Sequence, residues 1–178
     1  MQPLEKIAKE IEKCKECKKD KFGLPVPGEG NSRAKIMFIG ESPGSNEAKV
    51  GKPFVGRSGK FLTELLNSIG IKREDVFITS PVKYHQGKRN LEISEIKHGA
   101  KHLIKQIEVI KPKIIVLLGN VAIKATLDKG IKATENHGKL IEKKYFITFH
   151  PAAAIRFPKI KDLIKKDFEN LKQIIKSL

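Results

Sequence analysis

The sequence has 178 residues, of which 39% are hydrophobic and 31% are charged. This length and composition are typical of one water-soluble globular domain, so we expect residues 1–178 to fold as a unit and exclude a disordered chain. The longest apolar runs, such as residues 114–119, are far shorter than the ~20 residues that a membrane span requires. The N-terminal segment MQPLEKIAKEIEK has no apolar signal core, so we expect a cytoplasmic protein with no membrane partner.

The charge is strongly unbalanced, with 36 Lys and Arg against 20 Asp and Glu and a formal net charge of +16. A basic excess of this size indicates a polyanionic partner, most often nucleic acid. The alternative is solubility combined with thermal adaptation. The chain has 31 Lys, 5 Arg, 23 Ile and no Trp, a usage that is typical of hyperthermophiles.

The predicted elements alternate along the chain. Apolar positions 4, 7 and 11 predict an N-terminal helix, and a Cys-x-x-Cys pair and a turn-rich stretch follow it. Thereafter we expect a strand at 34–40, a helix at 61–69, a strand at 76–79, a helix at 94–110, a strand at 114–118, a helix after residue 120, a strand at 144–149 and a helix at 161–178. This alternation predicts an α/β fold with a mainly parallel four-stranded sheet that is covered on both faces.

Four segments follow these strands directly, at residues 40–44, 80–83, 119–120 and 150–151. Ligands of parallel sheets bind beyond the carboxyl ends of the strands, so we expect the four segments to converge on one site. Generic phosphate-binding and NAD-binding domains are disfavoured, because no G-x-G-x-x-G or G-K-[ST] loop follows the first strand.

Three residues at or near these ends could act on a ligand, and each also has a structural interpretation. Glu41 places a carboxylate in a Gly/Pro turn, or is simply an exposed turn residue. Phe54, between Pro53 and Gly56, could stack on a nucleic-acid base or could anchor its loop to the core. His150, before a rigid Pro, could donate a hydrogen bond or could be a structural residue.

The segments that carry these residues resemble the uracil-DNA glycosylase superfamily, most closely the family 4 enzymes of thermophiles. The matching motifs are Gly40-Glu41-Ser42-Pro43-Gly44-x-x-Glu47, Gly51-Lys52-Pro53-Phe54-Val55-Gly56-x-x-Gly59 and His150-Pro151-Ala152-Ala153-Ala154, together with the early Cys14-x-x-Cys17. The resemblance covers nearly the whole chain. It implies a three-layer α/β/α sandwich around a four-stranded sheet, and hydrolysis of the N-glycosidic bond of uracil in DNA to leave an abasic site.

The resemblance also implies roles for residues. Glu41 would hold the attacking water or steady the sugar cation, and His150 would hydrogen-bond uracil O2. The flipped base would stack on Phe54. Residues expected to bind the substrate are Gly40, Ser42, Phe54, Ser80 and Asn120, and those expected to contact DNA are Pro43, Gly44, Lys83, Pro151, Ala152, Ile155 and Arg156. We also expect Lys88, Arg89 and Lys159 near this edge, and a protein that acts on DNA as a monomer.

The sequence departs from the family pattern at Ser80, where the family usually has an Asn that reads the uracil edge. A hydroxyl is shorter and less selective than an amide. Removal of another deaminated base, such as hypoxanthine, therefore stays open beside removal of uracil, and so does a catalytically weak nucleic-acid-binding homologue.

The second departure concerns the four cysteines with which the family usually holds a 4Fe–4S cluster. This chain has only Cys14 and Cys17. The third cysteine would fall near Tyr84 or His85 and the fourth near His98 or Gly99, and the nearby helix instead carries the pair His98-x-x-x-His102. Cys14, Cys17, His98 and His102 could form a structural zinc site. A cluster with ligands other than cysteine and a metal-free arrangement are the alternatives. We expect no cofactor to be required for the chemistry.

Overall fold

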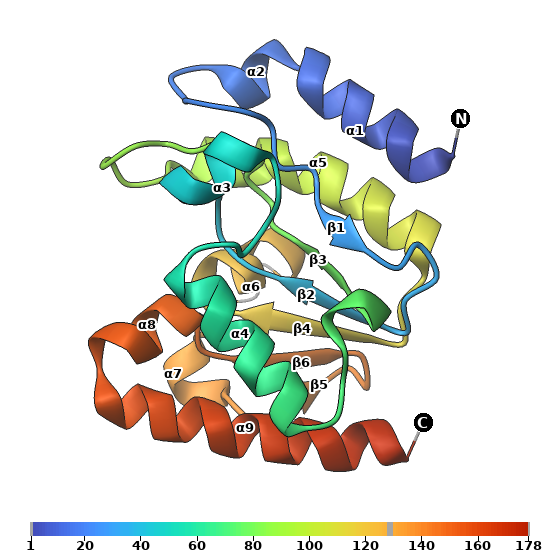
Figure 1. The fold of residues 1–178 in the computed structure, drawn as a ribbon, viewed down its shortest axis with the longest axis vertical. Helices are drawn as coiled ribbons and strands as arrows, with labels where there is room; N and C mark the ends of the chain where they lie inside the picture. Colours follow the sequence, from blue (N-terminus) through green and yellow to red (C-terminus); the bar gives the residue numbers. More distant parts are fainter. Residues whose placement is uncertain (1, 128–129, 178) are drawn as a thin grey trace.

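In the computed structural model, which describes residues 2–127 and 130–177, a six-stranded sheet lies between helices (Figure 1). The strand order is β1-β3-β2-β4-β6-β5. The bounds are β1 Glu29–Gly30, β2 Ile36–Ile39, β3 Phe77–Thr79, β4 Ile114–Leu118, β5 Leu140–Ile141 and β6 Tyr145–Thr148.

The four predicted strands form the parallel centre of this sheet, from β3 through β2 and β4 to β6. The two-residue strands β1 and β5 pair antiparallel at the edges, so the expected number of four strands is wrong for the whole sheet. Their two residues are too few for a periodic pattern to reveal. All residues of β2, β3 and β4 are buried, because helices cover both faces of the central sheet.

The helices form two groups by their contacts. On one side α4 packs against α8 and α9, and on the other α5 packs against α6, while α1 and α2 pack on α5. Their bounds are α1 Pro3–Lys13, α2 Lys15–Lys18, α3 Ser45–Val50, α4 Arg57–Ser68, the 3-10 turn η1 Arg73–Asp75, α5 Ile93–Ile110, α6 Asn120–Thr126, α7 Ala133–Asn136, α8 Pro151–Arg156 and α9 Pro158–Lys176. This layering confirms the expected α/β class.

The helix boundaries differ from the predicted ones where the N-terminal turn is polar. Helix α4 begins at Arg57, one turn before the first apolar residue Phe61, and α9 begins at Pro158 instead of residue 161. Proline is favoured in the first turn because it lacks the N–H that would remain unpaired there. The predicted end of α9 at residue 178 lies outside the described residues.

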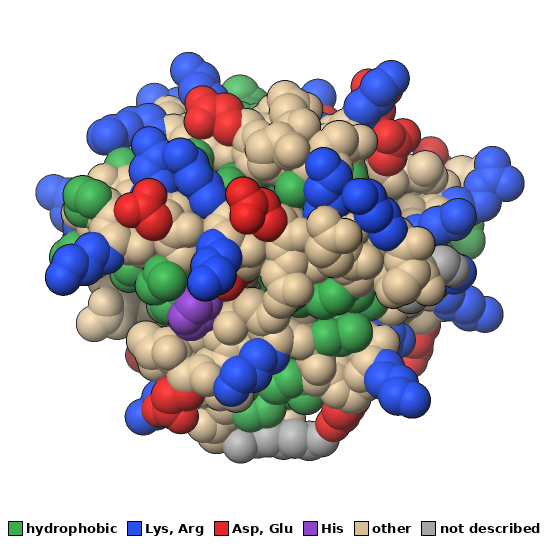
Figure 2. Space-filling model, turned by 90° about the horizontal axis from the view of Figure 1, so that it is seen from below, with side chains coloured by type: hydrophobic (Ala, Val, Ile, Leu, Met, Phe, Trp, Pro, Cys, Tyr) green, Lys and Arg blue, Asp and Glu red, His purple; other side chains and the backbone are tan. Residues whose placement is uncertain are grey.

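The surface charge is dispersed over the face shown in Figure 2, where Lys and Arg side chains lie among Asp and Glu side chains. Within the described residues, no helix is both long and apolar enough to cross a membrane.

Candidate active site

A pocket of about 270 Å³ opens beyond the carboxyl ends of β2, β3 and β6. Strand β2 leads into the loop that carries Glu41, β3 ends before Ser80, and β6 ends two residues before His150. The structure therefore brings together three of the four segments that the sequence placed at strand ends. The pocket is lined by Val26, Glu41, Ser42, Pro43, Gly44, Glu47, Pro53, Phe54, Ser58, Ser80, His85, Gln86, His150 and Ala152.

Phe54 and His150 form the aromatic part of the pocket. Their rings stack with centroids 5.5 Å apart and planes inclined by 27°. The backbone of Phe54 adopts a left-handed conformation with φ +50°, which costs about 1–3 kcal/mol for a residue other than glycine. Gly40 provides the space, because a Cβ atom there would lie 2.7 Å from Cε2 of Phe54. A flat base would therefore meet a ring that is held in place.

Hydrogen bonding fixes the tautomer of His150. Its Nδ1 accepts a hydrogen bond from the backbone N–H of Ala152 at 3.1 Å and so caps helix α8. Burial lowers the pKa of His150 to about 4, which keeps the ring neutral at physiological pH. Since Nδ1 is the acceptor, the proton of the neutral ring is on Nε2. His150 is thus a neutral donor.

Glu41 is half-buried beside these rings, in the loop after β2. Burial raises the pKa of its carboxyl group above the ordinary value, because removing water disfavours the charged form. A raised pKa makes the ionised carboxylate a stronger base than a fully solvated one. The carboxyl group is suited to accepting a proton in the pocket.

The loop that carries Phe54 is held by a buried carboxylate, Glu47. Its Oε1 accepts hydrogen bonds from the backbone N–H groups of Val55 at 2.9 Å and Gly56 at 2.8 Å. Arg73 holds the other side of Phe54, donating from Nη2 to the carbonyl of Pro53 at 2.6 Å. Sequence reasoning assigned no role to Glu47, although it stands in one of the motifs, because its partners are backbone groups of a separate loop.

Ser80 is buried at the base of the pocket and its hydroxyl already has a partner. Its Oγ donates to the carbonyl of Val82 at 2.8 Å. Because that proton is committed, the hydroxyl offers only its lone pairs to a base.

Four expected contact residues, Gly40, Lys83, Asn120 and the buried Pro151, are not among the lining residues, and two of them have polar side chains that are held elsewhere. Lys83 is buried, with Nζ donating to Oγ1 of Thr79 at 2.8 Å and to Oε1 of Gln106 at 2.9 Å, so the predicted DNA contact is wrong. Oδ1 of Asn120 accepts from the backbone N–H of Ala133 at 2.8 Å, and Asn120 is not among the lining residues. Both follow a strand, but tertiary contacts direct their side chains elsewhere.

A second hollow adjoins the pocket and carries expected DNA-contact residues. It shares Gly44, Glu47, Ser58 and Ala152 with the pocket and adds Ser45, Asn46, Gly56, Arg57, Ile155 and Arg156. Arg57, Ile155 and Arg156 are exposed, so two guanidinium groups and an apolar side chain stand beside the opening. Among the other expected basic residues, Lys88 and Lys159 are exposed, while Arg89 is paired with Glu95 at 2.6 Å.

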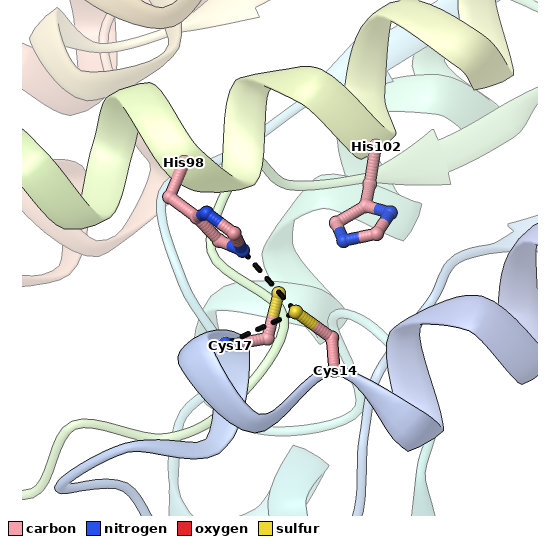
Figure 3. Close-up of side chains that lie close together, drawn as sticks. All are labelled: Cys14, Cys17, His98 and His102. Atoms are coloured by element: carbon pink, nitrogen blue, oxygen red, sulfur yellow. Dashed lines mark hydrogen bonds between the residues drawn. The ribbon is translucent and has the colours of Figure 1, made fainter.

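A Cys/His group lies outside the pocket, between the N-terminal helices and α5 (Figure 3). One possible ligand atom from each of Cys14, Cys17, His98 and His102 lies within 4.8 Å of all the others. The four residues that the sequence placed together are therefore close in space and could hold a metal ion. Burial and the neighbouring Cys14 raise the pKa of the Cys17 thiol to about 12.

Comparisons with known proteins agree with this geometry. The family model described as the uracil DNA glycosylase superfamily matches residues 27–176. A type-4 uracil-DNA glycosylase of Saccharolobus solfataricus is 44% identical over 99% of this chain and 88% of its own length. Relatives with the same name from Archaeoglobus fulgidus and Thermotoga maritima are 35% and 37% identical, over 98% and 97% of this chain and 94% and 95% of their own lengths. The chain belongs to the uracil-DNA glycosylase superfamily.

Proposed function

We propose that this chain hydrolyses the N-glycosidic bond of uracil in DNA and leaves an abasic site. The observation that carries the proposal is the shared pocket of Glu41, Phe54 and His150, in which a carboxyl group and a neutral donor flank an aromatic ring. The type-4 relatives support it, because they carry the same activity in their names and align over nearly the whole chain. All three groups come from one chain, which is consistent with action as a monomer.

Substrate binding begins with extrusion of the base, because a stacked base cannot enter a pocket. Phe54 would stack on the flipped uracil, an interaction that contributes about 1–3 kcal/mol per base. Arg57 and Arg156 in the adjoining hollow would contact phosphates, and the exposed Ile155 would fill the space that the base leaves in the duplex.

The bond between C1′ and N1 then breaks, and its electron pair leaves with uracil as an anion. The Nε2–H of His150 would donate to O2, where negative charge develops, so this bond is stronger in the transition state than in the ground state. Water adds to C1′, and Glu41 would accept its proton. These steps use only side chains of the pocket and water, so the proposed hydrolysis requires no cofactor. A metal held by the Cys/His group would have a structural role.

Hypoxanthine stays a second candidate base because of Ser80. A hydroxyl that can only accept suits the N3–H of uracil and equally the N1–H of hypoxanthine, whereas N3 of cytosine is itself an acceptor. The small serine side chain also leaves more room than an asparagine would.

A panel of oligonucleotides tests the proposal, each with one uracil, hypoxanthine or mismatched cytosine, in single and double strands. We expect single-turnover cleavage of uracil, detected as alkali-labile abasic sites. No release of uracil at elevated temperature would refute the function, and faster release of hypoxanthine would favour the second candidate.

Two variants of His150 separate its catalytic from its capping role. His150→Asn keeps an acceptor for the N–H of Ala152 but loses the donor at Nε2, so we expect normal thermal stability and a rate reduced about 10²–10³-fold. His150→Gln restores an N–H near Nε2 and should recover part of the rate. Equal, wild-type rates in both variants would remove His150 from the mechanism.

A further inference from the structure

Two side-chain polar atoms of the described residues are buried without a hydrogen-bond partner, Nδ1 of His102 and Oε1 of Gln86. Buried polar atoms in native proteins are nearly always paired, because an unpaired one loses its hydration without compensation. His102 belongs to the Cys/His group and Gln86 lines the pocket. The unpaired Oε1 of Gln86 belongs to a residue of the pocket, and His102 offers a ring nitrogen within 4.8 Å of the ligand atoms of Cys14, Cys17 and His98.

We propose that Cys14, Cys17, His98 and His102 bind one structural zinc ion. Two residues separate Cys14, the N-cap of α2, from Cys17 inside α2, and the two histidines lie one helical turn apart on α5. Both spacings are typical of Cys2His2 zinc ligands. Sγ of Cys14 lies 3.2 Å from Nε2 of His98, and the backbone N–H of Cys17 donates to the same sulfur at 3.4 Å. Zn–S bonds of about 2.3 Å and Zn–N bonds of about 2.0–2.1 Å place tetrahedral ligand atoms roughly 3.3–3.8 Å apart. The four ligand atoms all lie within 4.8 Å of one another, so shifts of about 1–1.5 Å at most would bring them to that separation.

The same geometry does not fit an iron–sulfur cluster. Four thiolates hold a 4Fe–4S cluster, and this chain has two cysteines. In a 2Fe–2S cluster with two Cys and two His, the cysteines bind one iron and the histidines the other, so the sulfide bridge separates the two pairs. A contact of 3.2 Å between a Cys sulfur and a His nitrogen instead indicates ligands of the same ion. The cluster that the family resemblance implies is thus replaced by a mononuclear site.

The zinc ion would fasten the N-terminal helices to α5. Cys14 lies between α1 and α2, while both histidines project from α5 (Figure 3). The segment that follows α2 pairs with the loop after β3, with the N–H of Phe22 donating to the carbonyl of His85 at 2.9 Å. His85 also lines the pocket and contacts the carbonyl of Pro43 through Nδ1 at 2.9 Å. The ion would therefore stabilise the frame of the pocket without touching the substrate.

Elemental analysis tests the site on full-length protein without a histidine tag, produced with both iron and zinc in the medium. We expect about one zinc per chain, iron well below that, and no brown colour. His102→Gln and Cys17→Ser should lose the zinc, whereas His137→Gln, a matched histidine paired with Asp167 outside the group, should keep it. In wild-type protein, cobalt substitution should give the intense visible absorption of tetrahedral cobalt with thiolate ligands, and a chelator should lower the melting temperature.

Three results would overturn the zinc proposal. One is iron with inorganic sulfide in stoichiometric amounts. The second is failure of wild-type protein to take up zinc or cobalt after reconstitution. The third is zinc whose content is unchanged when His98 and His102 are replaced.

A second proposal concerns Gln86 and rests on the proposed function. We infer that its amide reads the pairing edge of uracil, which Ser80 cannot do alone because its proton is given to Val82. Nε2 of Gln86 can donate to O4, which the Ser80 hydroxyl cannot do, and the unpaired Oε1 of Gln86 can accept from N3–H together with that hydroxyl. The amide function that the family resemblance assigns to position 80 would thus come from the loop after β3.

A base without these groups provides the test, because pyrimidin-2-one has neither O4 nor N3–H. Gln86→Ala should slow single-turnover release of uracil about 10-fold or more and leave any release of pyrimidin-2-one unchanged, while Gln173→Ala on the exposed side of α9 should alter neither. Equal slowing on both bases, or no slowing on uracil, would overturn the role of Gln86. Inactivity of the wild type on uracil would instead refute the proposed function.

Discussion

Glu47 provides a direct test of how the pocket is held, because one buried carboxylate oxygen accepts two backbone N–H groups of the loop that carries Phe54. A hydrogen bond to a charged group contributes about 1.5–3 kcal/mol, so Glu47→Ala should destabilise the fold by roughly 3–6 kcal/mol. In a domain of this size each kcal/mol lowers the melting temperature by about 2–4 °C, which gives an expected decrease of about 6–24 °C. Glu47→Gln keeps an acceptor in place and should lose about half as much.

The same substitution should slow catalysis. Phe54 is held at φ +50° against a local cost of about 1–3 kcal/mol, and without Glu47 the loop can relax to an ordinary conformation. Loss of its stacking would slow uracil release about 10–100-fold in single-turnover assays at a temperature where both proteins are folded. Glu64→Ala, an exposed carboxylate on α4, is the matched control and should alter neither quantity. If Glu47→Ala behaves like Glu64→Ala in both assays, Glu47 does not position the loop.

Three further perturbations address the pocket and its surroundings. The rate of uracil release should rise with pH through the pKa of Glu41, which burial raises above its ordinary value of 4.5, whereas Glu41→Gln should be slow and independent of pH over this range. The buried charge of Glu41 destabilises the folded state at neutral pH, and this penalty disappears only as the pH falls through the raised pKa. Glu41→Gln removes the charge and should therefore raise the melting temperature at neutral pH. A wild-type pH profile in that variant would assign the proton to another group. Gly40→Ala should abolish most activity by displacing Phe54, since its Cβ would lie 2.7 Å from that ring, and an unchanged rate would show that the ring adapts freely. Arg156→Ala and Lys159→Ala should each reduce the slope of the logarithm of the DNA-binding constant against the logarithm of salt concentration by about 0.9 on duplex DNA. Lys83 is buried, so Lys83→Met should leave this slope unchanged, and a reduced slope would contradict that burial.

The sequence by itself determined the central architecture and the place of the site. The buried strands are continuous apolar runs because both of their faces are covered, and such runs can be recognised without knowing their partners. Parallel strands bring their carboxyl ends to one edge, so Glu41, Ser80 and His150 could be assigned to one site before their contacts were known. Helical spacing likewise placed His98 and His102 on one face of α5.

Tertiary structure alone decided which polar side chains face the site. Four polar residues near strand ends or motif loops show this. Lys83 is buried among oxygen acceptors, and Asn120 accepts a hydrogen bond from Ala133 of α7. Glu47 holds the loop of Phe54, and Gln86 lines the pocket. The edge strands β1 and β5 also could not be predicted, because two residues form no recognisable pattern in the sequence. The direction of a polar side chain depends on donors and acceptors that other segments bring near it, and these partners lie up to 95 residues away, as between Lys105 and Glu10. The spacing of apolar residues along the sequence indicates which face of a helix or strand is buried, but it carries no information about such distant partners.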